Sequence, residues 1–175
     1  MVDRPDLTDR VAIVTGGGKG IGRAIAMGFA QSGAKVMVAA RTTSEIEAVA
    51  DEILSQGGNA VAHTTDLTQG EAIEALVEAT VAAFGGIDFL VNNAARSFLR
   101  PLLDLREDGF DKIFDTNVKG TFLLSRSAAK VMAKSGGGRI VNITSVAAER
   151  GAPMMGVYHA SKAAVKMLTM CMAVE

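Results

Sequence analysis

Short apolar runs alternate with longer amphipathic stretches along this chain, and that alternation restricts its fold more than any other feature of the sequence. Such apolar runs predict buried strands, and the stretches between them have the spacing of helices. Strands that are apolar on both faces and separated by helices favour a parallel sheet covered on both sides. Because crossovers between parallel strands are right-handed, the sequence predicts an α/β fold with a doubly wound parallel sheet.

The element boundaries follow from the apolar runs and their flanking residues. The predicted strands are Val11–Thr15, Val36–Ala40, Ala60–Thr64, Ile87–Val91 and Arg139–Ile143. The predicted helices span 21–32, 44–55, 68–84 and 111–134, and a last one begins near Val157 and is still running at Glu175. Ser44 is expected to cap the second helix, because Glu47 follows it three residues later.

Composition excludes several classes of protein. The chain has 175 residues and a formal net charge of -1, so it lacks the basic balance that nucleic-acid binding requires. It contains no apolar run that could span a bilayer and no secretory leader, which favours a cytoplasmic protein without a membrane partner. Two histidines, His63 and His159, leave little for a metal site. Cys171 lies among apolar residues, and we expect a packed thiol there rather than a nucleophile.

A glycine cluster, Thr15-Gly-Gly-Gly-Lys-Gly-Ile-Gly22, separates the first strand from the first helix. Glycines at such a turn let backbone N–H groups approach a pyrophosphate at the helix N-terminus, although a flexible turn explains a lone cluster equally well. The spacing does not fit G-x-G-x-x-G, but it fits T-G-x-x-x-G-x-G. With this spacing the chain resembles the short-chain dehydrogenase/reductase family of the ordinary short type. The predicted cofactor-binding residues in the loop are Gly16, Gly18, Lys19, Gly20, Ile21 and Gly22.

The end of the second strand predicts which nicotinamide cofactor binds. NAD-preferring Rossmann domains usually place a carboxylate there to bind the ribose 2′-hydroxyl, and an Arg accommodates a 2′-phosphate instead. This chain has Ala40 and Arg41 at that point and no carboxylate before Glu45. By resemblance, Ala40 occupies the position of the Asp in NAD-preferring members. Together with Lys19, Arg41 predicts NADP as the cofactor.

Two further stretches match the family. Asp66, followed by Leu67 after the third strand, resembles the family's adenine-contacting Asp; a cap for the third helix is an alternative that is compatible with that role. Asn92-Asn93-Ala94-Ala95 resembles the family's N-N-A-G, and Asn93 is expected to contribute to cofactor binding. Ala95 replaces the last glycine, so the backbone must manage there without glycine's conformational freedom.

Tyr158 and Lys162 stand four residues apart near the start of the last helix, so both project from one face. An ammonium beside a phenol favours the phenolate, which suits proton transfer to or from an alcohol or ketone. Taken alone, the pair could equally be a chance surface pair. Ser145 follows the fifth strand, at the sheet edge where open α/β folds bind their ligands.

The resemblance completes the catalytic set, because Asn117, Ser145, Tyr158 and Lys162 match the family's Asn, Ser, Tyr and Lys. It implies that Tyr158 is the general acid/base and that Ser145 orients the substrate carbonyl. Lys162 would bind the nicotinamide ribose and assist Tyr158, so both also count as cofactor-binding residues. Asn117 would hold a water in the proton relay.

The implied function is an NADP-dependent oxidoreductase that interconverts a carbonyl and a secondary alcohol, with a non-catalytic NADP-binding protein or an inactive fragment as the alternative. The resemblance covers residues 1–175 as a single Rossmann domain, whereas family members usually continue through two more strands and a substrate-covering loop. We therefore expect a domain that is incomplete at its C-terminus, with the fifth strand at an aggregation-prone edge. By resemblance, the full-length protein forms a homodimer or homotetramer.

Overall fold

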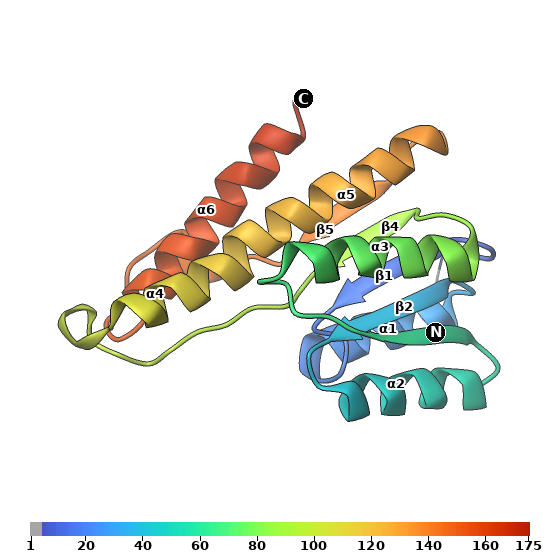
Figure 1. Cartoon of the computed structure of the whole chain (residues 1–175), viewed down its shortest axis with the longest axis horizontal. Helices are drawn as coiled ribbons and strands as arrows, with labels where there is room; N and C mark the ends of the chain where they lie inside the picture. Colours follow the sequence, from blue (N-terminus) through green and yellow to red (C-terminus); the bar gives the residue numbers. More distant parts are fainter. Residues whose placement is uncertain (1–4) are drawn as a thin grey trace.

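The computed structural model describes residues 5–175 and contains one parallel sheet of five strands in that range. The order across the sheet is β3-β2-β1-β4-β5, and every neighbouring pair is parallel (Figure 1). This arrangement confirms the predicted doubly wound parallel sheet. The strands are β1 (Val11–Thr15), β2 (Lys35–Ala40), β3 (Asn59–Thr64), β4 (Phe89–Asn92) and β5 (Arg139–Asn142).

Helices connect the strands and cover both faces of the sheet. They are α1 (Gly20–Gln31), α2 (Thr43–Ser55), α3 (Gly70–Phe84), α4 (Glu107–Phe114), α5 (Thr121–Lys134) and α6 (Gly156–Met172). Three short elements add to them: the 3-10 turns η1 (Leu102–Asp104) and η3 (Val146–Ala148), and the π-helical segment η2 (Asp115–Gly120). Figure 1 shows α3 and α5 side by side, and the two helices are in contact.

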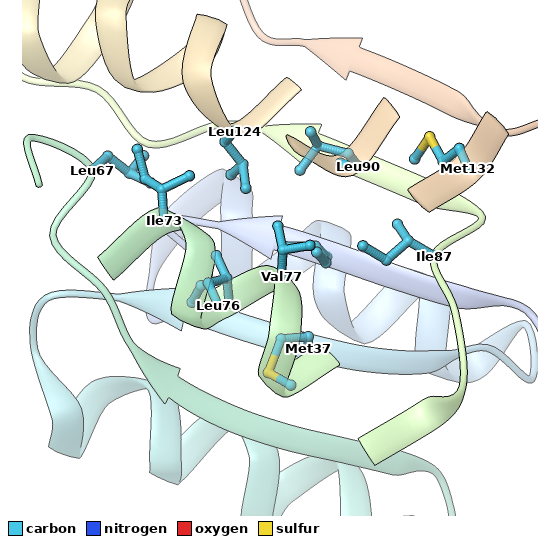
Figure 2. Close-up of a cluster of buried hydrophobic side chains, with 12 residues drawn as sticks. Met37, Leu67, Ile73, Leu76, Val77, Ile87, Leu90, Leu124 and Met132 are labelled. Atoms are coloured by element: carbon cyan, nitrogen blue, oxygen red, sulfur yellow. The ribbon is translucent and has the colours of Figure 1, made fainter. Parts of the chain in front are cut away.

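Alternate residues of the central strands point to opposite faces, and each face has its own core. Ile13 of β1 packs with residues of α3 and α5, including Leu76 and Leu124, in the cluster drawn in Figure 2. Val14, the next residue of β1, packs instead with α1 and α2, where Ile46 is fully buried. The apolar character of both strand faces in the sequence therefore reflects burial on both sides.

The sheet order reverses direction at β1, because the chain moves outward to β2 and β3 and then returns to β4 beside β1. The crevice at the carboxyl ends of β1 and β4 is the position where open α/β sheets bind ligands. β3 and β5 are the two edge strands of the sheet, and Val141 of β5 is 48% exposed. The edge position predicted for this strand is thus present in the described chain.

One predicted helix ends where expected but begins earlier and is not uniform in geometry. The stretch predicted from 111 to 134 begins four residues earlier, at Glu107, and passes through the π-helical segment η2 before continuing as α5. A Cβ on Gly120 would lie 2.7 Å from the carbonyl oxygen of Leu67, so η2 packs closely on the segment that follows β3. Single π-turns inside α-helices frequently mark functional sites, and this one contains Asn117.

Several smaller predictions are wrong. α2 begins at Thr43, so Ser44 lies inside the helix and the capping position is Thr42. α6 ends at Met172 and does not continue to Glu175. Cys171 is exposed rather than packed, because it lies on the outward side of the last turn of α6.

Among the helices within residues 5–175, none is long and apolar enough to cross a membrane. In the same range, no group of three or more His, Cys, Asp or Glu side chains could hold a metal ion.

Candidate active site

An open cavity of about 320 Å³ lies at the carboxyl ends of β1 to β4. The lining comes from the glycine loop, the end of β2 and the start of α2, the residues after β3, the residues after β4, and Thr116 of η2. Of the predicted cofactor-binding residues, the lining contains Gly16, Gly18, Lys19, Arg41, Asp66, Leu67 and Asn93. Gly20, Ile21 and Gly22 form the first turn of α1, directly after Lys19, but they are not among the described residues that line the cavity.

The glycine loop is fixed tightly to the end of β4. Gly16 has a φ of 62°, which a residue with a side chain rarely adopts, and a Cβ on Gly22 would collide with the carbonyl oxygen of Gly16. Asn93 Nδ2 donates to the carbonyl oxygens of Thr15 at 3.0 Å and Gly16 at 3.3 Å. Asn93 therefore lines the cavity, and its side chain holds the loop in place.

Thr15 is a residue of this site that sequence reasoning missed. Its hydroxyl donates to the carbonyl oxygen of Val91 at 3.2 Å and accepts from the backbone N–H groups of Asn93 at 3.0 Å and Ala94 at 3.1 Å. These bonds join the end of β1 to the end of β4. The sequence feature that could have identified Thr15 is its place as the first residue of the T-G-x-x-x-G-x-G motif. A buried threonine at the end of an apolar strand is otherwise unremarkable in a sequence.

The cavity lining carries side chains of opposite charge. Lys19 Nζ lies 3.1 Å from Glu45 Oε1, and both residues line the cavity. Arg41 is exposed and has no hydrogen bond or ion pair with another side chain in residues 5–175. The lining therefore contains one cation that is paired with a carboxylate and one cation, Arg41, that has no side-chain partner in the described residues.

Asp66 forms a turn and does not cap α3. Its Oδ1 accepts hydrogen bonds from the N–H and the hydroxyl of Thr68, both at 2.9 Å. Because this turn delays the helix, α3 begins at Gly70 rather than at the predicted Thr68, and Gln69 occupies the capping position. The capping alternative for Asp66 is therefore wrong.

Ala95 lines the same cavity without a strained backbone. It is not among the described non-glycine residues that have a positive φ. Ala95 stands where the family's N-N-A-G pattern has its last glycine, and the backbone there does not require a positive φ in this chain.

Lys162 links α6 to the end of β5. It is 4% exposed, and its Nζ donates to the carbonyl oxygen of Ile143 at 2.7 Å. The same Nζ lies 5.8 Å from the centroid of the Tyr158 ring. Burial lowers the pKa of Lys162 below its ordinary value, because desolvation penalises the ammonium.

Ser145 follows Ile143 closely and begins the turn η3, which α6 contacts. Its Oγ accepts from the N–H of Ala147 at 3.1 Å, so the hydroxyl proton stays available to another acceptor. The half-buried Ser145 thus lies in the segment that Lys162 binds.

Asn117 is 1% exposed, and its carboxamide has partners in two other segments. Its Oδ1 accepts from the N–H of Arg96 at 2.7 Å, and its Nδ2 donates to the carbonyl oxygen of Arg96 at 3.0 Å. The same Nδ2 donates to Ser161 Oγ at 2.9 Å, and Ser161 Oγ donates to the carbonyl oxygen of Tyr158 at 2.7 Å. One chain of hydrogen bonds therefore joins the loop after β4, the π-turn and the first turn of α6.

Ser161 is the second residue that sequence reasoning missed. It is fully buried and lies directly before Lys162. Its spacing of three residues from Tyr158 places it near the same helix face, but no local pattern reveals that its partner is Asn117.

The structure does not merge the catalytic and cofactor residues into one cavity. None of Asn117, Ser145, Tyr158 and Lys162 is among the described residues that line it. Thr116 lines the cavity and directly precedes Asn117 in the π-turn, so it connects the cavity to one of these four residues.

Comparison with known proteins agrees with this geometry. The sequence profile of the family described as short chain dehydrogenase matches residues 10–175. The chain belongs to the short-chain dehydrogenase family. A 3-oxoacyl-[acyl-carrier-protein] reductase from Synechocystis sp. is 38% identical to it over 170 residues, which make up 97% of this chain and 69% of the reductase. A Bos taurus protein named dehydrogenase/reductase SDR family member 4 is 39% identical, over 100% of this chain and 63% of that protein.

Solved structures of family members have the same fold. A short-chain type dehydrogenase/reductase from Mycobacterium marinum superposes with a TM-score of 0.93 at 38% identity, covering 97% of this chain and 70% of the other. A metagenomic short-chain oxidoreductase in complex with NADP has a TM-score of 0.92 at 36% identity, covering 96% of this chain and 76% of the other. The chain thus spans between 63% and 76% of the length of these four proteins.

Proposed function

We propose that this short-chain dehydrogenase is an NADP-dependent oxidoreductase that interconverts a carbonyl and a secondary alcohol, with Tyr158 as the general acid/base. The observation that carries the proposal is the buried ammonium of Lys162, which lies beside the Tyr158 ring and binds the chain two residues before Ser145. Burying an ammonium costs free energy even with the hydrogen bond to the carbonyl oxygen of Ile143. Its place beside the only tyrosine of the chain supports a role for Lys162 in proton transfer by Tyr158.

The cavity suits a dinucleotide phosphate. α1 begins at Gly20, beside the lining residue Lys19, and the positive end of a helix favours a pyrophosphate. The crowding at Gly16 and Gly22 leaves no room for side chains between the loop and β4. Arg41, which is exposed and unpaired within residues 5–175, can receive a 2′-phosphate. Asp66 and Leu67 line the same cavity and would contact the adenine side of the cofactor.

When bound, NADPH supplies a hydride for the carbonyl carbon, and the protein must manage the proton. Tyr158 gives its hydroxyl proton to the developing alkoxide in reduction and takes a proton from the alcohol in oxidation. Lys162 Nζ lies 5.8 Å from the ring centroid and would bind the nicotinamide ribose, which places the cofactor beside Tyr158. Ser145 can donate to the substrate oxygen, because its own oxygen already accepts from Ala147.

Asn117 acts on the site by holding segments together. Its carboxamide is occupied by Arg96 and Ser161, so its side chain fixes the loop after β4 against α6. A water held near Asn117 in the proton relay stays a prediction from the resemblance. Association into a homodimer or homotetramer stays one as well.

Two measurements on the chain test the proposal. The fluorescence of added NADPH reports binding, and the loss of its absorbance with a panel of ketones reports turnover. The proposal expects both signals. Binding without turnover of any ketone would favour the alternative, a nucleotide-binding protein that does not catalyse. Absence of NADPH binding would refute both functions.

A further inference from the structure

The cavity lining contains a carboxylate that the proposed function does not use. Lys19, Arg41 and Glu45 all line the cavity, and Lys19 Nζ lies 3.1 Å from Glu45 Oε1. The other acid of the lining, Asp66, already accepts two hydrogen bonds from Thr68. Glu45 is therefore the carboxylate in this cavity that remains available to influence a charged ligand.

The position of Glu45 is fixed by its surroundings. It lies in the first turn of α2, where its N–H donates to the carbonyl oxygen of Thr42 at 3.2 Å, and a carboxylate is favoured at a helix N-terminus. The glycine loop packs directly against it, because a Cβ on Gly18 would lie 2.8 Å from Glu45 Cβ. The side chain of Glu45 is 35% exposed and that of Lys19 is 80% exposed. Of the two side chains, that of Lys19 is the more exposed and is therefore the one that can move out of the ion pair.

We propose that Glu45 is a specificity-determining residue that lowers the affinity of the cavity for a ribose 2′-phosphate by engaging Lys19. The inference rests on the proposed nucleotide site. A 2′-phosphate must separate Lys19 from Glu45 and then lie near a carboxylate of its own charge sign. A 2′-hydroxyl carries no charge, so its binding requires neither the separation of Lys19 from Glu45 nor the approach of two negative charges. Glu45 therefore narrows the preference for NADP over NAD that Arg41 and Lys19 create.

The test uses two ligands that lack the nicotinamide half of the cofactor and differ in the 2′-phosphate, adenosine 2′,5′-bisphosphate and adenosine 5′-monophosphate. Isothermal calorimetry gives the ratio of their affinities for the unmodified chain and for Glu45→Gln, which keeps the shape of the side chain. Because exposed ion pairs are weak, we expect the ratio to move toward the bisphosphate by about twofold to fivefold. Glu47→Gln is the matched control, since it removes the same charge from an exposed position of α2 outside the cavity lining.

A second background tests the route through Lys19. In Lys19→Met, the further change Glu45→Gln is expected to shift the affinity ratio by less than half of the shift seen with Lys19 present. An unchanged ratio in Glu45→Gln, an equal shift in Glu47→Gln, or a full shift in the Lys19→Met background would each overturn the inference. A lack of 2′-phosphate preference in the unmodified chain would instead refute the NADP assignment, and the predicted shift for Glu45→Gln would still be measurable.

Discussion

Ser161→Ala should destabilise the protein by more than the loss of one helix-surface hydrogen bond. The substitution removes the oxygen that accepts from Asn117 Nδ2 at 2.9 Å, in a place where Ser161 is fully buried. One N–H of Asn117 then has no partner, because the other is used by the carbonyl oxygen of Arg96. A buried unsatisfied donor costs about 1–3 kcal/mol. For a domain of this size the melting temperature should fall by roughly 2–4 °C for each kcal/mol.

Ser55→Ala is the matched control for that measurement. Ser55 Oγ donates to the carbonyl oxygen of Glu52 at 2.8 Å, three residues earlier, just as Ser161 Oγ donates to that of Tyr158 at 2.7 Å. Ser55 is exposed and accepts from no other side chain in residues 5–175. Thermal unfolding followed by circular dichroism compares the two variants. If Ser161→Ala lowered the melting temperature no more than Ser55→Ala does, the hydrogen bond from Asn117 would contribute nothing.

Three further predictions concern the cofactor, Lys162 and the sheet edge. Ala40→Asp combined with Arg41→Gln should reverse a preference for NADPH over NADH that we expect to be about tenfold or larger, and calorimetry showing equal affinities in the unmodified chain would contradict it. Because burial lowers the pKa of Lys162 in the folded state, its charge costs stability at neutral pH, and this cost disappears as the pH rises toward the ordinary value of 10.5. The unfolding free energy of the wild type in urea should therefore rise relative to that of Lys162→Met over the alkaline range, and parallel curves would refute the assignment. Val141→Lys should reduce aggregation of the chain measured by light scattering, because Val141 is exposed on the edge strand β5, and equal scattering would exclude that edge as the cause.

The fold could be predicted from sequence because its central strands β1 and β2 are buried on both faces. Ile13 and Val14 belong to different cores, so each apolar run is continuous and its ends are easy to find. The helix that contains Asn117 is predicted as one regular stretch, because π-turns are rare exceptions within α-helices. Cys171 was misjudged because apolar neighbours in sequence do not show which side of a helix end is covered.

For the candidate site, the sequence supplies the residues but not their connections. The resemblance supplied Asn117, whereas nothing in the sequence shows that its carboxamide binds the backbone of Arg96 and the side chain of Ser161. Likewise, Glu45 lies beyond the end of β2, and only the three-dimensional structure reveals that it packs against the glycine loop at Gly18.

Tyr158→Phe tests the central claim most directly. The substitution removes one hydroxyl and keeps the ring near which Lys162 Nζ lies, at 5.8 Å from its centroid. Because the glycine loop and Lys162 are unchanged, NADPH affinity measured by fluorescence should stay the same. The rate of ketone reduction should fall by about 10²- to 10⁴-fold, the usual contribution of general acid/base catalysis. A Tyr158→Phe protein that binds NADPH normally and reduces ketones at a near-normal rate would mean that the proton comes from another group.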